Sequence, residues 1–214
     1  MHILSVNIGQ RTPIANAKAS GITGIYKNPA NRPVMVTSLG LAGDFIADTK
    51  HHGGVDQAVY VYGTDDYDWW AAELGRPLAP GTFGENLTIA GLASGKLAVG
   101  DRLHLAEVVL EVTMPRIPCA TLAARMGDPK FVKRFRAAER PGVYCRVIRP
   151  GPAAAGEAVR LEPSAGRTIT VLEMFRDHYD SEWDETKLRR RLAAPIAIRA
   201  REDAEERLAR LMGS

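Results

Sequence analysis

Cys119 is the residue of this chain with the clearest potential for chemistry. It follows the segment 115–118 (Pro-Arg-Ile-Pro), in which two prolines prevent continued strand pairing. A helix-forming stretch, residues 120–126, comes next. The N-terminus of a helix and the nearby Arg116 should lower the pKa of this thiol and favour the thiolate. A thiolate can be a nucleophile or a ligand for a soft metal. The alternative is a small buried hydrophobic side chain.

The segment 50–54 (Lys-His-His-Gly-Gly) is a second candidate. Its histidines lack the i, i+4 partner of metalloproteases, and no CxxC pair or third histidine supplies a zinc cage. The two glycines allow the backbone to approach a ligand closely. Backbone amides, with Lys50 and His51 or His52, could bind an anionic oxygen. A glycine turn with solvated charges is the alternative.

Two further segments carry residues that are unusual for structure alone. In 83–86 (Phe-Gly-Glu-Asn), Gly84 permits an unusual backbone angle, and Asn86 offers a donor and an acceptor at the start of a predicted strand, unless it only forms a turn. Residues 99–101 (Val-Gly-Asp) indicate a tight turn. Glycine-rich nucleotide loops, a Ser-His-Asp arrangement and a nucleophile elbow are missing from the sequence.

Short strands separated by Gly, Pro and Asn/Asp turns are predicted to position these segments. Their close spacing is typical of a barrel or sandwich and not of alternating βαβ units. Cys145 lies inside one of them and is expected in the core, and both cysteines are expected to be reduced thiols. The predicted strands cover residues 3–8, 33–38, 57–62, 85–89, 102–106, 108–114, 142–149 and 158–161.

Helices are predicted between these strands and beyond them. Residues 65–73 follow Thr64 as N-cap, and 129–138 follow Asp128 as N-cap. Beyond residue 163 the pattern changes to three charged amphipathic helices over 168–179, 185–192 and 199–212. We therefore predict a β domain at 1–163 and a three-helix C-terminal domain at 164–214.

Composition limits the classes of function. The net charge of +3 over 214 residues is far below what nucleic-acid binders concentrate on one face. No apolar run approaches the roughly 20 residues of a membrane span, and the N-terminus does not resemble a signal peptide. We expect a cytoplasmic protein that binds neither nucleic acid nor a membrane.

Taken together, these segments resemble the MOSC domain, the molybdenum-cofactor-sulfurase C-terminal-like family. The D-x-x-HHGG-x-D-x-A block, FGENL, VGD and PRxPC follow one another in the order typical of the family, and the match continues into 142–147 (Gly-Val-Tyr-Cys-Arg-Val). The helical tail is similar to the three-helix domain of the YiiM-like branch. The resemblance implies a mainly β, α+β fold: a MOSC-type β-barrel with helical insertions and a three-helix appendage.

The resemblance also implies an activity and a site. Members of this branch hold a mononuclear molybdenum on molybdopterin and reduce N-hydroxylated compounds such as 6-hydroxylaminopurine by removing the N–OH oxygen. Cys119 would be the metal ligand and a catalytic residue together with His52. The cofactor-binding residues would be Lys50, His51, Gly53, Gly54, Asn86, Arg116 and Arg146. Cys145, and the sequence Asp48-Thr49-Lys50 where Arg is frequent, depart from the family pattern and leave the identity of the phosphate-binding cations open.

Electrons for such a reaction must come from outside the chain. Two cysteines are too few for an iron–sulfur cluster, and no dinucleotide fingerprint is present. The sequence therefore predicts a separate flavin- or iron–sulfur-dependent reductase as electron donor. We expect the protein itself to be a monomer or a homodimer. The alternative function is a carrier of molybdenum cofactor, or of persulfide sulfur on Cys119, without redox turnover. A purely structural or interaction module is a third interpretation.

Overall fold

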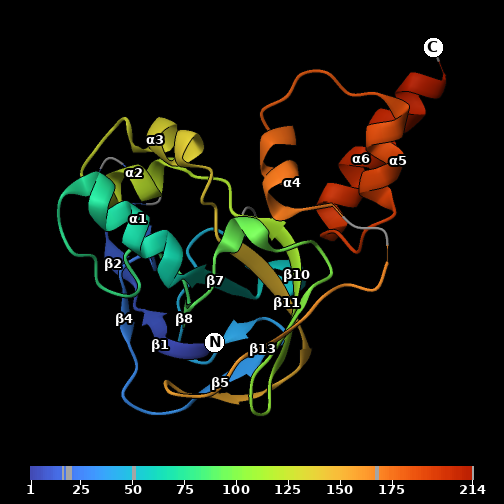
Figure 1. Cartoon of the computed structure of the whole chain (residues 1–214). Helices are drawn as coiled ribbons and strands as arrows, with labels where there is room; N and C mark the ends of the chain where they lie inside the picture. The colour runs from blue at the N-terminus through green and yellow to red at the C-terminus, as the bar shows by residue number, and fades with distance from the viewer. Residues whose placement is uncertain (16, 18–20, 50–51, 167–168, 214) are drawn as a thin grey trace.

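The computed structural model describes residues 1–15, 17, 21–49, 52–166 and 169–213. A curved eight-stranded sheet forms its centre, with one group of helices over each side of its upper edge in the view of Figure 1. The strands lie in the order β13 (Arg160–Glu162), β9 (Arg102–His104), β10 (Val109–Pro115), β11 (Val143–Arg149), β7 (Val59–Gly63), β8 (Leu87–Ala90), β1 (His2–Gly9) and β4 (Lys27–Pro29).

Two smaller sheets complete the β structure. They contain β12 (Gly151–Ala153), β5 (Val34–Thr37) and β6 (Gly40–Leu41), and β2 (Thr12–Pro13) with β3 (Ile22–Thr23). Neighbouring strands are antiparallel, except that β7 and β8 pair in parallel. This parallel pair needs a crossover, and α1 (Thr64–Leu74) provides it.

The central strand β7 is buried on both faces because two apolar clusters meet there. Val59 and Val61 point into an aliphatic core that the small β5 sheet helps to enclose. Tyr60 and Tyr62 point the other way, into an aromatic cluster that includes Trp70 of α1. This alternation follows from the period-2 geometry of a strand. The aromatic side is covered by α1, α2 (Ala120–Met126) and α3 (Phe131–Ala138).

The helix termini differ slightly from prediction for local reasons. Residues 120–126 are helical as predicted. Thr64 is the first helical residue of α1 and not its N-cap, because its hydroxyl accepts a hydrogen bond from the Gly91 amide at 3.0 Å. Helix α3 begins at Phe131 because the Asp128 carboxylate caps the Lys130 amide at 2.8 Å within the preceding turn.

The three predicted C-terminal helices are present as α4 (Val171–Asp177), α5 (Glu185–Leu192) and α6 (Ile198–Met212). A capping box between Thr170 and Glu173 starts α4. These helices share a small core with the sheet domain, in which Met174 and Ile196 pack with Val99. The predicted domain boundary at residue 163 stays a prediction. None of the described helices is long and apolar enough to cross a membrane.

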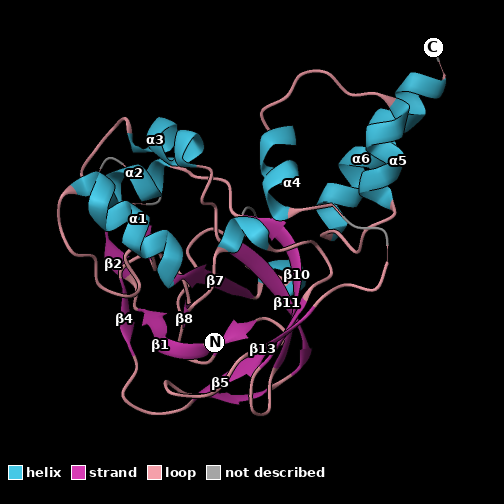
Figure 2. Ribbon diagram, viewed as in Figure 1, coloured by secondary structure: helices cyan, strands magenta, loops and turns pink. Residues whose placement is uncertain are grey.

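The fold is α+β, as predicted, but the expected barrel is not closed. Figure 2 shows the sheet curling so that its two ends approach one another. Within the described residues, this approach is secured by an isolated bridge between His2 and Ala158 and by single backbone bonds around it. No ladder joins the end strands β13 and β4. Strand β4 ends at Pro29, which has no N–H for further pairing.

Candidate functional site

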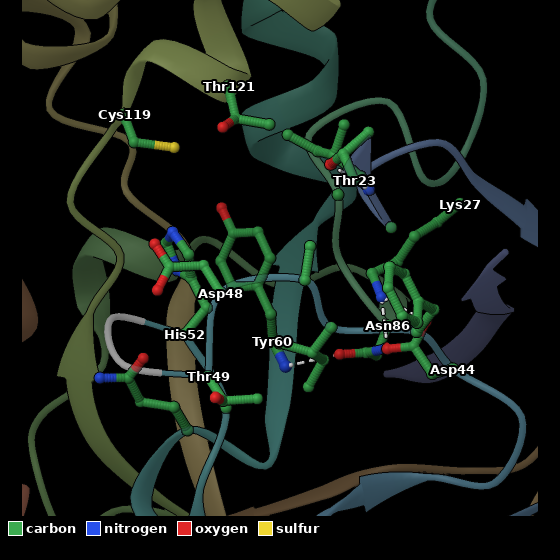
Figure 3. Close-up of a pocket in the computed structure, with 18 of the residues that line it drawn as sticks. Thr23, Lys27, Asp44, Asp48, Thr49, His52, Tyr60, Asn86, Cys119 and Thr121 are labelled. Carbon is green, nitrogen blue, oxygen red and sulfur yellow. Dashed lines mark hydrogen bonds and ion pairs between the residues drawn. The ribbon is translucent and has the colours of Figure 1, made fainter. Parts of the chain in front are cut away.

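A cavity of about 440 Å³ lies between the 44–53 loop, the 22–27 segment, β7 and the start of α2. Five of the predicted site residues line it: His52, Gly53, Asn86, Arg116 and Cys119. In Figure 3, Cys119 and His52 lie on one side, Lys27, Asp44 and Asn86 on the other, and the Tyr60 ring stands between them. Segments far apart in the sequence therefore meet here.

Cys119 is the N-cap of α2, with extended backbone angles, and its side chain is half-buried at the cavity wall. Burial raises the pKa of its thiol. Hydrogen bonding with His52 and the positive charge of Arg116 outweigh that effect and bring the pKa down to about 5. At neutral pH the sulfur is therefore a thiolate that faces the cavity. Cys145, in contrast, is fully buried in the aliphatic core.

His52 is held from two directions. Its backbone amide donates to the Asp48 carbonyl at 2.9 Å, and its ring Nδ1 lies 3.1 Å from the hydroxyl of Tyr144. The next residue, Gly53, has a φ of +80°, and a Cβ there would lie 3.0 Å from the Ile46 Cδ1. This backbone angle therefore favours glycine at position 53.

Arg116 is a buried cation of the site, with 4% of its surface exposed. Its Nη1 donates to the Phe83 carbonyl, and its guanidinium stacks 5.0 Å from the centre of the Tyr60 ring. Its Nε hydrogen-bonds to none of the described groups. Gly84 makes room for this arrangement, since a Cβ there would lie 2.8 Å from Ile25 and 3.5 Å from the Arg116 Nη1.

The side chains of Glu85 and Asn86 hydrogen-bond the 83–86 segment to its neighbours in the fold. The buried Glu85 carboxylate accepts from the Gly81 amide and the Thr88 hydroxyl, both at 2.7 Å, and burial raises its pKa. The Asn86 side chain accepts from the Tyr60 amide at 3.1 Å through Oδ1. The amide group of Asn86 is thus largely used in structure, although the residue lines the cavity.

The part of the chain that the structure describes contains no group of three or more His, Cys, Asp or Glu side chains able to hold a metal. Cys119 could supply one soft thiolate ligand. A metal at this site would therefore need its remaining ligands from the group that carries it into the cavity.

The model of the MOSC domain matches residues 48–160, more than half of the chain. The chain belongs to the MOSC domain family. It is 35% identical to the uncharacterized protein YflK of Bacillus subtilis (strain 168) over 191 aligned residues. The alignment covers 89% of this MOSC protein and 86% of YflK. It is 31% identical to the protein YiiM of Escherichia coli (strain K12), over 80% of this chain and 78% of that protein.

The chain is also similar to part of a longer protein and to a solved structure over nearly its whole length. A protein of Gibberella moniliformis named Reductase is 34% identical over 65% of this MOSC protein, which corresponds to 25% of its own length. The crystal structure of YiiM from Geobacillus stearothermophilus superimposes with a TM-score of 0.80 and 25% identity, covering 97% of this chain and 98% of that one. The predicted YiiM-like relationship is confirmed.

Other predicted site residues of this MOSC protein lie apart from the cavity. Arg146 does not line it, because its guanidinium bonds Asp56 at 2.8 Å and the carbonyls of Pro195 and Ile196 at 3.2 and 3.1 Å. In the structure Arg146 joins elements of the fold, and its predicted anion binding stays a prediction. Gly54 precedes a short turn, η1 (Val55–Gln57), and does not line the cavity either. Lys50 and His51 lie outside the described residues.

The MOSC cavity also contains residues that the sequence did not single out. Lys27 and Asp44 form a buried ion pair, with Nζ 2.6 Å from Oδ1, and Asp44 also accepts from the Asn86 side chain at 2.9 Å. Burial lowers the pKa of Lys27, against the opposing effect of Asp44. Tyr60 and Tyr144 face one another across β7 and β11. Both lie in segments that the sequence predicted only as strands, 57–62 and 142–149, and no local signal distinguishes the two tyrosines.

Proposed function

We propose that this MOSC protein is a molybdenum-cofactor-dependent reductase of N-hydroxylated compounds such as 6-hydroxylaminopurine. The observation that carries the proposal is the Cys119 thiolate in the wall of a cavity, with His52 and Arg116 beside it. The family relationship makes a molybdenum cofactor the group to test against these residues.

The residues present fit that group. The thiolate of Cys119 is a suitable ligand for a metal held by a pterin dithiolene, which brings its own sulfur ligands. Arg116 places a positive charge in the cavity wall for the anionic phosphate of the cofactor, whereas the charge of Lys27 is balanced by Asp44. A volume of about 440 Å³ is within the range of small-molecule and cofactor sites. When bound, the cofactor supplies two-electron redox chemistry that protein side chains cannot perform.

The balanced reaction shows what the chain itself must contribute. R–NH–OH, two electrons and two protons give R–NH₂ and water, with cleavage of the N–O bond. His52 lines the cavity beside Cys119 and can hold and deliver a proton to the leaving oxygen. Tyr60, Tyr144 and Ile25 form an apolar wall that would contact a flat heterocycle and exclude water.

The electrons would come from a separate flavin- or iron–sulfur-dependent reductase. The chain itself has two cysteines, and one of them is buried in the core. The relative named Reductase supports this partnership, because its similarity to this chain occupies only 25% of a longer protein named for reduction.

The proposal is tested with protein made in cells that synthesise the cofactor. We expect about one molybdenum per chain by elemental analysis, and reduction of 6-hydroxylaminopurine with an artificial electron donor. Cys119→Ser should lose both the metal and the activity. Cys145→Ala is the control that keeps them. Molybdenum-loaded protein without activity would contradict the reductase function, and full activity in Cys119→Ser would contradict the ligand assignment.

The ionised thiol at the cavity wall favours one second candidate. A thiolate of low pKa could attack the outer sulfur of a donor persulfide and become a persulfide itself while the donor thiolate leaves, or it could hold the cofactor only to pass it on. Mass spectrometry of protein purified without reductant separates the two. A persulfide on Cys119 in protein that does not turn over would favour the carrier.

A further inference from the structure

We propose that Thr121 binds the hydroxyl of the N–OH group and so makes the site prefer N-hydroxylated compounds to the corresponding amines. The proposal rests on the proposed function, because it requires the N–OH oxygen to lie beside Cys119. Thr121 lies in the first turn of α2, two residues after Cys119, and both residues line the cavity.

The side chain of Thr121 faces the cavity because the next two residues fix the rotation of the helix. Leu122 and Ala123 are buried in the aromatic cluster, and their amides donate to the Cys119 carbonyl at 3.0 and 3.2 Å. Thr121 is left half-buried on the side of the cavity. In Figure 3, its hydroxyl and the Cys119 sulfur are directed toward one another. A branched Cβ leaves threonine few rotamers in a helix, so the hydroxyl has a limited set of directions.

The hydroxyl of Thr121 is available to a ligand, since it forms no hydrogen bond with the described part of the chain. Most other hydroxyls that line the cavity are used within the protein. That of Thr23 accepts from a backbone amide at 3.0 Å, and those of Tyr60 and Tyr144 bond a backbone carbonyl and a histidine ring. Thr49 also has a hydroxyl without a partner among the described residues, but it is exposed, and Figure 3 shows it away from Cys119.

A free hydroxyl beside Cys119 matches one part of the substrate. The N–OH group both donates and accepts hydrogen bonds, and so does the hydroxyl of threonine. The amine lacks this group, so in the same place it would leave the Thr121 hydroxyl without its partner. A site that binds a substrate hydroxyl rejects analogues without one for this reason. Thr121 exchanges no proton or electron in the reaction, and its role is to hold the N–OH group beside Cys119.

Equilibrium binding to the molybdenum-loaded enzyme, without an electron donor, tests the proposal independently of turnover. By isothermal titration calorimetry, the wild type should bind 6-hydroxylaminopurine about tenfold more tightly than 6-aminopurine. Thr121→Val keeps the branched shape and should bind the two compounds with affinities within about twofold of each other. Thr121→Ser keeps the hydroxyl and should retain the preference. Thr49→Val is the matched control and should behave as the wild type.

Two results would overturn the assignment of Thr121. One is a Thr121→Val variant that keeps the full preference for 6-hydroxylaminopurine, and the other is a Thr121→Ser variant that loses it. A wild type that binds both purines equally would overturn it as well, because no hydroxyl of the substrate would then be recognised.

Steady-state kinetics supply a second readout. Thr121→Val should raise KM for 6-hydroxylaminopurine about tenfold, with kcat and molybdenum content nearly unchanged, as expected when a contact of equal strength in substrate and transition state is lost. A molybdenum content that falls in Thr121→Val would show that Thr121 holds the cofactor and would overturn the assignment. A loaded wild type that binds 6-hydroxylaminopurine without reducing it would contradict the proposed function, whereas the calorimetry would still decide the role of Thr121.

Discussion

Opposing effects act on the Cys119 sulfur. Burial disfavours the thiolate, while His52 and Arg116 favour it, and the favourable pair is stronger. The local sequence predicts the direction of this result, since a cysteine preceding a helix and close to an arginine is expected to ionise. It does not show the part of His52, which is 67 positions away and reaches Cys119 only in the folded chain.

The first prediction concerns the reactivity of this thiol. In cofactor-free protein, the rate of Cys119 alkylation by iodoacetamide should rise with pH to half its maximum near pH 5, because the pKa is about 5. An ordinary cysteine reaches that point near pH 8.5. His52→Ala should move the midpoint upward. Mass spectrometry of the peptide that contains Cys119 gives the rate, and a wild-type midpoint near 8.5 would contradict the environment described.

The second prediction concerns Gly84, which adopts a φ of +79° beside Ile25 and Arg116. Gly84→Ala should lower the free energy of unfolding by about 2 kcal/mol, since it adds a clash to an unfavourable backbone angle. Gly127→Ala is the control, with φ of +67° and open space around the added Cβ, and should cost about 1 kcal/mol. Urea denaturation measures both, and equal costs would show that the space beside Ile25 is not restrictive.

At the scale of elements, one carboxylate joins the cavity loop to the C-terminal helices. Asp56 lies in η1, directly after the 44–53 loop and Gly54. Its Oδ1 bonds Arg146, and its Oδ2 accepts from the Ile198 amide at 2.7 Å, which caps the start of α6. Helix α6 has no cap from its own side chains. A residue 142 positions away therefore satisfies this helix terminus.

The third prediction tests this junction. Arg146→Met should lower the free energy of unfolding by about 1–3 kcal/mol, because it leaves the mostly buried Asp56 unpaired. Arg189→Met, which breaks the exposed pair with Glu185, should change it by less than about 0.5 kcal/mol. Urea denaturation measures both variants. If Arg146→Met instead kept its stability and lost molybdenum, the predicted cofactor-binding role of Arg146 would be correct.

At the scale of the whole molecule, the sheet and the C-terminal helices are packed together. Met174 of α4 and Ile196 share a core with Val99 of the sheet domain, and a backbone bridge joins Ala98 to Thr170. Figure 1 shows α4 above β10 at the upper edge of the sheet. Burial of this kind couples the folding of the two parts.

The fourth prediction follows from that coupling. Met174→Ala should lower the free energy of unfolding by about 2–4 kcal/mol, since Met174 is buried and its truncation leaves a cavity. Circular dichroism and tryptophan fluorescence should report one common transition in urea. Met212→Ala, at an exposed position of α6, is the control. Separate transitions would favour independent domains on either side of residue 163.

The sequence by itself determined the elements and the candidate residues. Period-2 patterns, caps and breakers predicted most of the longer strands and the helices, with 120–126 and 185–192 matching to the residue. These signals are local, so no tertiary information was required. The motifs around Cys119, His52 and Arg116 indicated the family and a common site, and all three residues line one cavity.

Only the tertiary structure decided how that site is held together. The Lys27–Asp44 pair, the contact of Tyr144 with His52 and the separation of Arg146 from the cavity depend on residues that are distant in sequence. The open edge of the sheet likewise depends on strands that meet only after folding. Side-chain contacts of this kind depend on how strands and loops pack in space. Local sequence patterns predict secondary structure, but they do not predict which distant residues come into contact.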